Sequence, residues 1–303
     1  MHVPFATAFL AGSLLAGAAL AQPRPAPDRA GQPERTGQPE RDPAARTVDL
    51  RPRFTKGQEV RYVMVLESKK SDAGDDDSSS RQEIGLLLRC TATDPEKGAT
   101  LELVYESLKA SLHTGLVDTE FDSSKPPNPD DIYDAALRSM VGLKVPVTIA
   151  PDGNVTSAGG GTQNALTAQF TGADIIRSVM GPIFSPKKGQ PTVRVGETWK
   201  TESEMHGLMG RMRLEMTHSL ASYAGGKAVI ETSGKALLDP SEGAGAPLVR
   251  ITDSTIQGRT VWNADAGLLD EHSSRQRFVI DALVNEQKIS TTQDMTVNVT
   301  RRK

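Results

Sequence analysis

The sequence predicts an α+β protein that is mainly antiparallel β, folded as a curved sheet or half-barrel with two helices packed on its apolar face. Three observations predict this class. Apolar and polar side chains alternate along several long segments, short turns rich in glycine and aspartate separate them, and only two segments have one-sided helical spacing. Strands with one apolar and one polar face are typical of antiparallel sheet packed on a single side.

The N-terminal segment predicts export. Residues 5–20 form an apolar, small-residue run that ends in Ala19-Leu20-Ala21, so 1–21 is predicted to be a secretory signal peptide cleaved before Gln22. The run is short for a membrane span. Residues 22–47 are rich in proline and contain a repeated Gly-Gln-Pro-Glu-Arg, which predicts a disordered spacer or, alternatively, a docking tail for a partner that binds proline-rich segments. The folded part is then a single β-rich domain at 48–303, in the periplasm or outside the cell.

Strands are predicted wherever the alternation is regular. In the first half the apolar-face sets are Val60, Tyr62, Met64 and Leu66, then Ile84, Leu86, Leu88 and Cys90, then Val104, Leu108 and Leu112. In the second half they are Met212, Leu214, Met216, His218 and Leu220, and finally Ile289, Met295, Val297 and Val299. Turns at 94–98, 151–153 and 265–267 contain glycine and an acid, so they are predicted to join neighbouring strands.

Two helices are predicted between these strands. The first covers 128–142, with Asn128 as its cap and Gly142 as its stop. The second covers 162–180 and is expected to end at Gly181-Pro182. Both have apolar residues on one side only, so each is expected to lie against the apolar face of the sheet.

The two halves of the folded part resemble each other. Gly57-Gln58-Glu59 and Gly196-Glu197-Thr198 each place a glycine and an acid at the start of a strand, and each half later has a hairpin. One interpretation is an internal duplication, with halves 48–160 and 190–303 joined by the helix at 162–180. The alternative is that any meander of alternating strands shows this degree of similarity.

Composition and motifs argue against several functions. The chain has 35 basic and 38 acidic residues and 4% aromatic residues, which gives no basis for binding nucleic acid or an anionic membrane. Common nucleophile, zinc and nucleotide motifs are absent, so the protein is predicted not to be an enzyme, and no cofactor or metal site is predicted. Cys90 is predicted to be a buried, inert thiol. The acidic run 72–77 suits a hairpin tip better than a calcium site, and 185–188 suits a solvated basic loop.

The candidate ligand-binding residues lie on one predicted strand. Met212, Met216, His218 and Leu220 share its apolar face, with Met205 and Met209 just before it. Flexible methionine side chains suit an adaptable hydrophobic pocket, and a histidine among them would supply the pocket with a polar group. The alternative is that this face is ordinary core with a hydrogen-bonded histidine.

Four features together carry a resemblance: the signal peptide, the strand start at 56–60, the hairpin at 145–155, and Val-Gly-Glu-Thr-Trp at 195–199. They resemble a family of exported bacterial proteins of unassigned function, which implies an envelope setting and supplies no catalytic residue. More loosely, the expected architecture resembles the half-barrels of periplasmic lipoprotein carriers.

The expected function is a non-enzymatic envelope protein that binds a hydrophobic ligand, such as a small molecule or lipid, or a partner protein. A structural or assembly module without ligand is the alternative. A third is an unrecognised hydrolase with a Ser/His/Asp cluster around His218 or His272.

Overall fold

The computed structural model describes residues 46–72, 77–115, 118–128, 132–159, 176, 180–187, 189–207, 210–240, 248–284 and 287–303. The strands are β1 Thr47–Asp49, β2 Glu59–Asp72, β3 Ser78–Asp94, β4 Gly98–His113, β5 Asp118–Asp122, β6 Lys144–Ile149, β7 Val155–Ala158, β8 Thr192–Arg194, β9 Thr198–Gly207, β10 Gly210–Ala224, β11 Lys227–Pro240, β12 Leu248–Asn263, β13 Leu268–Val284 and β14 Gln287–Arg302. Within these ranges no helix is both long and apolar enough to cross a membrane.

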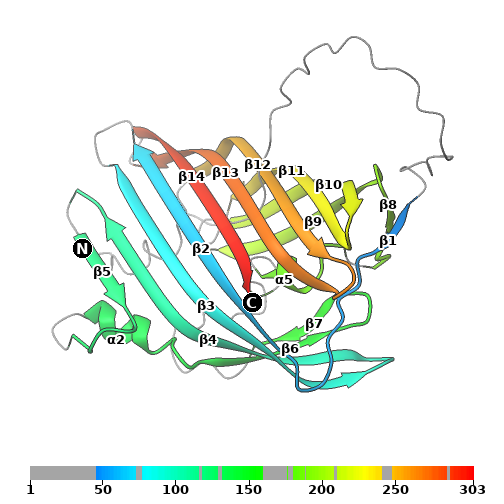
Figure 1. Cartoon of the computed structure of the whole chain (residues 1–303). Helices are drawn as coiled ribbons and strands as arrows, with labels where there is room; N and C mark the ends of the chain where they lie inside the picture. Colours follow the sequence, from blue (N-terminus) through cyan, green and yellow to red (C-terminus); the bar gives the residue numbers. More distant parts are fainter. Residues whose placement is uncertain are drawn as a thin grey trace, which may run out of the picture.

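One large antiparallel sheet dominates the molecule. Its strand order is β7-β6-β4-β3-β2-β14-β13-β12-β11-β10-β9, with β5 paired to one end of β4. The sheet is strongly curved and does not close on itself, so β7 and β9 are its terminal strands (Figure 1). The last strand of the chain, β14, lies between β2 and β13 and joins the two halves. The predicted fold class, a curved antiparallel sheet or half-barrel, is confirmed.

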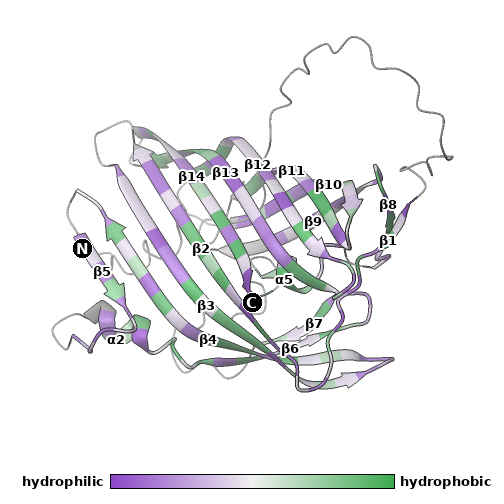
Figure 2. Cartoon of the chain, viewed as in Figure 1, coloured by the Kyte–Doolittle hydropathy of each residue, from purple (hydrophilic) through white to green (hydrophobic). Residues whose placement is uncertain are grey.

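Burial alternates along the long strands, and Figure 2 shows the corresponding hydrophobic and hydrophilic bands. The inward residues of β4 are Leu101, Leu103, Tyr105, Leu108 and Ala110. Val104 therefore faces outward, and the prediction that it shares a face with Leu108 is wrong. The reason is a β-bulge between Gly85 and Leu86 of β3, which leaves Glu106 with no residue opposite it on β3 and reverses the alternation.

The tip of the β13–β14 hairpin also departs from the prediction. Ile289 has the same parity as the buried Met295 and Val297, yet it is 44% exposed. It lies two residues from the start of β14, near the rim of the sheet. The prediction that it belongs to the core is wrong, because alternation fixes the face of a residue but not how far the packed region extends along the strand.

The first predicted helix is shorter than expected. α2 spans Ile132–Arg138, inside the predicted 128–142, and lies beside β5. Leu137 and the following Met140 are buried in the core. Gly142 takes the positive φ of +82° that ends this turn, as a stop residue should.

The second predicted helix lies mostly outside the described residues, although Ile176 and Met180 are buried. A short helix, α5 at Gly181–Phe184, begins where the prediction ends the helix. Met180 is not helical, so α5 is a separate helix, and the fixed φ and missing N–H of Pro182 suit its first turn. α5 lies against β13 on the inner side of the sheet (Figure 1).

The two predicted strand starts have matching geometry. Gly57 and Gly196 both have φ +86°, and their amides donate to the carbonyls of Cys90 and Leu220, each at 2.8 Å. In both turns the side chain after the glycine accepts a bond from the amide three residues earlier, at 2.9 and 3.0 Å. The strands before the turns, β1 and β8, pair with each other. These repeated contacts support the interpretation of the halves as copies.

Candidate functional site

The inner face of the sheet carries two separate apolar clusters among the described residues. The main core combines strand residues with side chains from outside the large sheet, such as Leu50, Val193 and Phe184. The second cluster consists of Met212, Leu214, Ala236, Ile256, Phe278 and Met295. Every member of the second cluster belongs to β10–β14, so these strands contribute to both clusters at different points along their length.

Uncharged polar residues lie between the two clusters on β10–β13. We call them the inner polar belt, which consists of His218, Thr232, Thr260, His272, Ser274 and Gln276. Strand pairing places Gly258 of β12 between Thr232 and Ser274. A glycine inside a strand often marks a place where a ligand or another backbone approaches closely.

The two belt histidines contact threonine hydroxyls. The Nε2 and Nδ1 atoms of His218 each lie 2.8 Å from a hydroxyl oxygen, of Thr201 and Thr232 respectively. His272 Nδ1 lies 2.9 Å from Thr260 Oγ1. Burial lowers the pKa of both histidines to about 4, and the charge of His218 adds to the effect on His272. Both rings are therefore neutral at pH 7.

Two belt side chains of β13 are buried without hydrogen-bond partners. Gln276 is 1% exposed, and within the described part of the chain neither its amide nitrogen nor its amide oxygen has a partner. Ser274, two residues earlier on the same face, is also 1% exposed, and its Oγ has none. An unsatisfied buried polar group costs about 1 to 3 kcal/mol. Such groups require an explanation, and hydrogen bonding to a bound molecule is one.

The belt continues at the terminal strand β9 with Trp199, whose ring stacks on His218 with centroids 5.4 Å apart. The indole Nε1 is buried and has no partner. Lys187 Nζ lies 5.3 Å from the centre of the indole ring and 3.1 Å from a Glu197 carboxylate oxygen. Lys187 is therefore buried rather than solvated. Residues 185–187 do form a loop, as predicted, whereas residue 188 lies outside the described residues; the ion pair and the indole hold Lys187 inward.

The predicted ligand-binding quartet is divided by this arrangement. Leu220 belongs to the main core, whereas Met212 belongs to the second cluster and Met216 packs against it. His218 lies between them, in the belt. The side chains of Met205 and Met209 lie outside the described residues. All four quartet residues share the inner face, as the alternation predicts, and their part in ligand binding remains a prediction.

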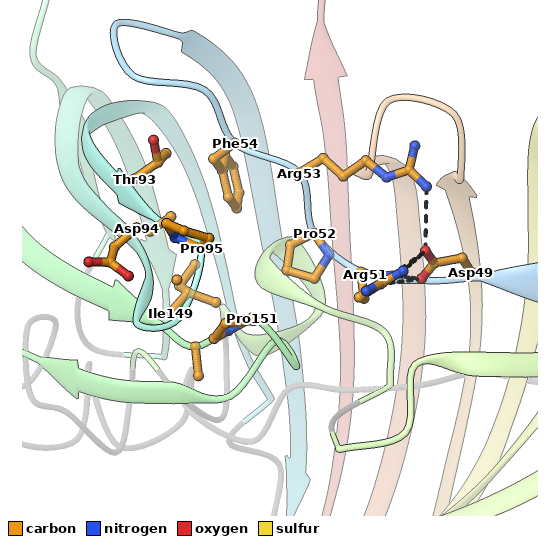
Figure 3. A pocket seen from close by; sticks show the side chains of 13 residues that line it. Asp49, Arg51, Pro52, Arg53, Phe54, Thr93, Asp94, Pro95, Ile149 and Pro151 are labelled. Carbon is orange, nitrogen blue, oxygen red and sulfur yellow. Dashed lines mark hydrogen bonds and ion pairs between the residues drawn. The ribbon is translucent and has the colours of Figure 1, made fainter.

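A pocket of about 550 Å³ opens elsewhere, between the segment after β1 and the turns β3–β4 and β6–β7 (Figure 3). Phe54, Pro52 and Pro151 line it. Its charged groups already have partners, since Asp49 accepts hydrogen bonds from Arg51 and Arg53. This pocket presents no unsatisfied group for a ligand to complete, so we regard it as a junction between turns.

Other predicted features have simple environments. Cys90 is buried, and burial raises the pKa of its thiol, as expected for an inert cysteine. The acidic run lies at the β2–β3 connection, where 73–76 fall outside the described residues. In the described ranges, no three His, Cys, Asp or Glu residues cluster as metal ligands would. Over the same ranges, the hydrogen bonds of His218 and His272 go to threonine and to no carboxylate.

Sequence reasoning missed Ser274 and Gln276. Alternation of apolar with polar residues does not reveal the inner face of β13, because the inward positions of this strand are partly polar. The signal was nevertheless present. From Glu271 to Phe278, the charged residues Glu271, Arg275 and Arg277 all have odd numbers, and every even-numbered side chain is uncharged. Alternation between charged and uncharged polar residues would have identified the inner face of this strand.

No protein-family model matches this chain, and no curated protein is similar to it. A lipovitellin structure described by its lipid–protein interactions is 11% identical, with a TM-score of 0.48, and the match covers 83% of this chain and 26% of that one. This chain thus spans about a quarter of that protein.

Two further solved structures are similar over most of both chains. DynF, from the dynemicin biosynthesis pathway of Micromonospora chersina, is 9% identical over 89% of this chain and 92% of its own, with a TM-score of 0.25. An outer membrane channel from Pseudomonas putida F1 is 10% identical over 83% and 97%, with a TM-score of 0.23. At these TM-scores, none of the three carries an argument about function.

Proposed function

We propose that this protein is an exported, non-enzymatic envelope protein that binds a hydrophobic small molecule or lipid on the inner face of its sheet. The observation that carries the proposal is the second cluster, which is apolar, faces inward and is separated from the main core by the inner polar belt. A protein that needed its inner face only for stability would gain most from one continuous apolar core. An interrupted face suits a ligand with apolar and polar parts.

Several other features support the proposal. The sheet is open between its terminal strands β7 and β9, so its inner face is not sealed by strand pairing. The belt histidines have a pKa of about 4, which makes them weak general bases at neutral pH and favours a binding role over hydrolysis. The signal-peptide pattern at 1–21 supports the envelope location.

The first test is extraction with organic solvent of protein purified from its native host, followed by mass spectrometry. We expect a stoichiometric apolar molecule to be released. If no such molecule is released, and the purified protein also fails to bind a neutral hydrophobic dye, the proposed function is contradicted.

A matched pair of substitutions on β10 locates the site. Met216 faces inward against the second cluster, and its neighbour Thr217 faces outward and is exposed. We expect Met216→Glu to abolish dye binding, because a carboxylate beside the apolar cluster is costly to desolvate. Thr217→Glu is the control and should bind normally. Equal binding by the two variants would place the ligand elsewhere.

The alternative function is a structural or assembly module. The observation that favours it is the pair of exposed apolar residues Leu283 and Ile289 at the β13–β14 rim, which are 45% and 44% exposed. Crosslinking in the native envelope distinguishes the two functions. A specific crosslinked partner that disappears on replacing both residues with serine, together with an empty extract, would favour the assembly module.

A further inference from the structure

Gln276 lies at an inward position of β13. Its amide is almost completely buried, and among the described residues neither its donor nor its acceptor has a partner. The neighbouring inward positions do not supply partners, because strand pairing places Ile256 on one side and Met295 on the other. A comparable glutamine on the same face, Gln293 of β14, donates from Nε2 to Ser68 Oγ at 3.3 Å. Burial alone therefore does not explain why Gln276 is unsatisfied.

The surroundings of Gln276 combine polar and apolar groups in a fixed order along β13. The unpartnered hydroxyl of Ser274 lies two residues towards the main core, and Phe278 of the second cluster lies two residues the other way. Residues two apart on a strand share a face and are separated by about 7 Å. A molecule lying along this strand would thus meet hydrogen-bonding groups at one end and an apolar surface at the other.

The belt has no fixed charge to offer a ligand. Its members are serine, threonine, glutamine and two histidines that are neutral at pH 7. Lys187, a buried cation that contacts Trp199 beside the belt, is already paired with Glu197. A buried carboxylate or phosphate without a cation is strongly disfavoured. An uncharged polar group that donates and accepts hydrogen bonds, such as a carboxamide, fits the unsatisfied amide of Gln276.

We propose that the inner polar belt binds the uncharged head group of an amphiphile, with Gln276 and Ser274 hydrogen-bonded to the head and the second cluster in contact with its apolar chain. This inference rests on the proposed function and specifies its ligand class. Gln276 is the specificity-determining residue, because both its amide nitrogen and its amide oxygen lack a protein partner among the described residues.

The test measures competition for the neutral fluorescent probe 1-aminoanthracene, using the purified full chain at pH 7.5. Three competitors share a ten-carbon chain: decanamide, decanoate and 1-chlorodecane.

We expect decanamide to bind at least about tenfold more tightly than decanoate, because only decanoate must bury a carboxylate without a cation. Replacement of Gln276 by methionine, which has a similar shape, should weaken decanamide about five- to tenfold, the value of roughly one net hydrogen bond or slightly more. Binding of 1-chlorodecane should change less than about twofold, because it makes no strong hydrogen bond.

The control is Gln257→Met, the same substitution on the outer face of the adjacent strand β12, which should leave all three affinities unchanged. Should Gln276→Met not fold, Ser274→Ala provides the same selective test with a smaller change in volume. The inference is overturned if decanoate binds as tightly as decanamide, or if the belt variants bind decanamide like the unaltered protein. In both of those cases the chain still binds hydrophobic molecules. If neither the probe nor any competitor binds, it is the proposed function itself that fails.

Discussion

The two ends of the inner face are built from the same strands but are packed differently. At one end, residues of β11–β14 join side chains from β1, β8 and α5 in the main core. At the other end, all described members of the second cluster are strand residues, and the inner polar belt separates it from the main core. Alternation in a sequence therefore identifies which face of a strand points inward. It does not tell whether that face is used for stability or for binding.

The largest expected difference is between leucines at the two ends. Leu103 is fully buried in the main core and Leu214 is buried in the second cluster. We expect Leu103→Ala to lower the free energy of unfolding by about 4 kcal/mol and Leu214→Ala by about 2 kcal/mol, because fewer atoms surround the smaller cluster. Denaturant unfolding without added ligand measures both. Equal losses would mean that the second cluster is ordinary core.

The two histidines of the inner polar belt predict that the folded protein loses stability at acidic pH. The folded pKa of about 4 for His218 and His272 lies below the ordinary value of 6.5, so the unfolded chain binds more protons between these values. Their stabilising contribution is complete above pH 6.5 and is lost as the pH falls towards 4. At pH 5 the loss is about 2 kcal/mol for each histidine.

Between pH 7 and pH 5, the free energy of unfolding should therefore fall by about 2 kcal/mol less in the His272→Asn variant than in the unaltered protein. Urea unfolding at the two pH values measures this difference, and carboxylates that titrate in the same range cancel in the comparison. Parallel curves for the two proteins would show that His272 is not buried in its neutral form.

A smaller effect, of opposite sign, is expected at Gln276. Replacement by methionine removes two unsatisfied polar atoms, so we expect the ligand-free protein to gain about 1 to 2 kcal/mol. The same substitution at Gln293 breaks its bond to Ser68 and should cost about 1 kcal/mol. Thermal unfolding of the two variants is the measurement. A destabilised Gln276→Met variant would indicate that the amide has a partner in solution.

The smallest effect concerns the main-core end, where both strand starts lie. Gly57 and Gly196 have the same φ of +86°, and a Cβ at either would meet no atom within 4 Å. Alanine at each position should therefore cost only the strain of the left-handed backbone, about 1 kcal/mol. Equal losses would strengthen the case that the two turns are copies, whereas losses that differ by more than about 1 kcal/mol would argue against it.

The sequence was sufficient for the architecture because alternation is enforced by burial along strands of fourteen or more residues, such as β2 and β14. Alternation gave the wrong face where a bulge adds one residue to a strand. The bulge at Glu106 is set by pairing with β3, a non-local contact that gives no local signal, so Val104 was assigned to the wrong face. Similarly, Lys187 is buried because of an ion pair with a residue ten positions later.

The candidate site was only partly predictable. Met212, Met216, His218 and Leu220 were placed on one face correctly, but the division between two clusters depends on which other strands lie beside each residue. Gln276 was missed because a polar residue at an inward position looks like a break in the pattern. Its burial follows from the pairing of β13 with both β12 and β14, which the chain does not encode locally.

The position of β14 has a consequence for biosynthesis. β14, which is synthesised after the other strands of the sheet, lies in the middle of it, between β2 and β13. Until it arrives, those two neighbours both present bare edges, and exposed edges are templates for aggregation. A polypeptide that stops before residue 287 is thus divided at its centre rather than trimmed at one side. We expect a premature stop codon that removes β14 to yield insoluble product.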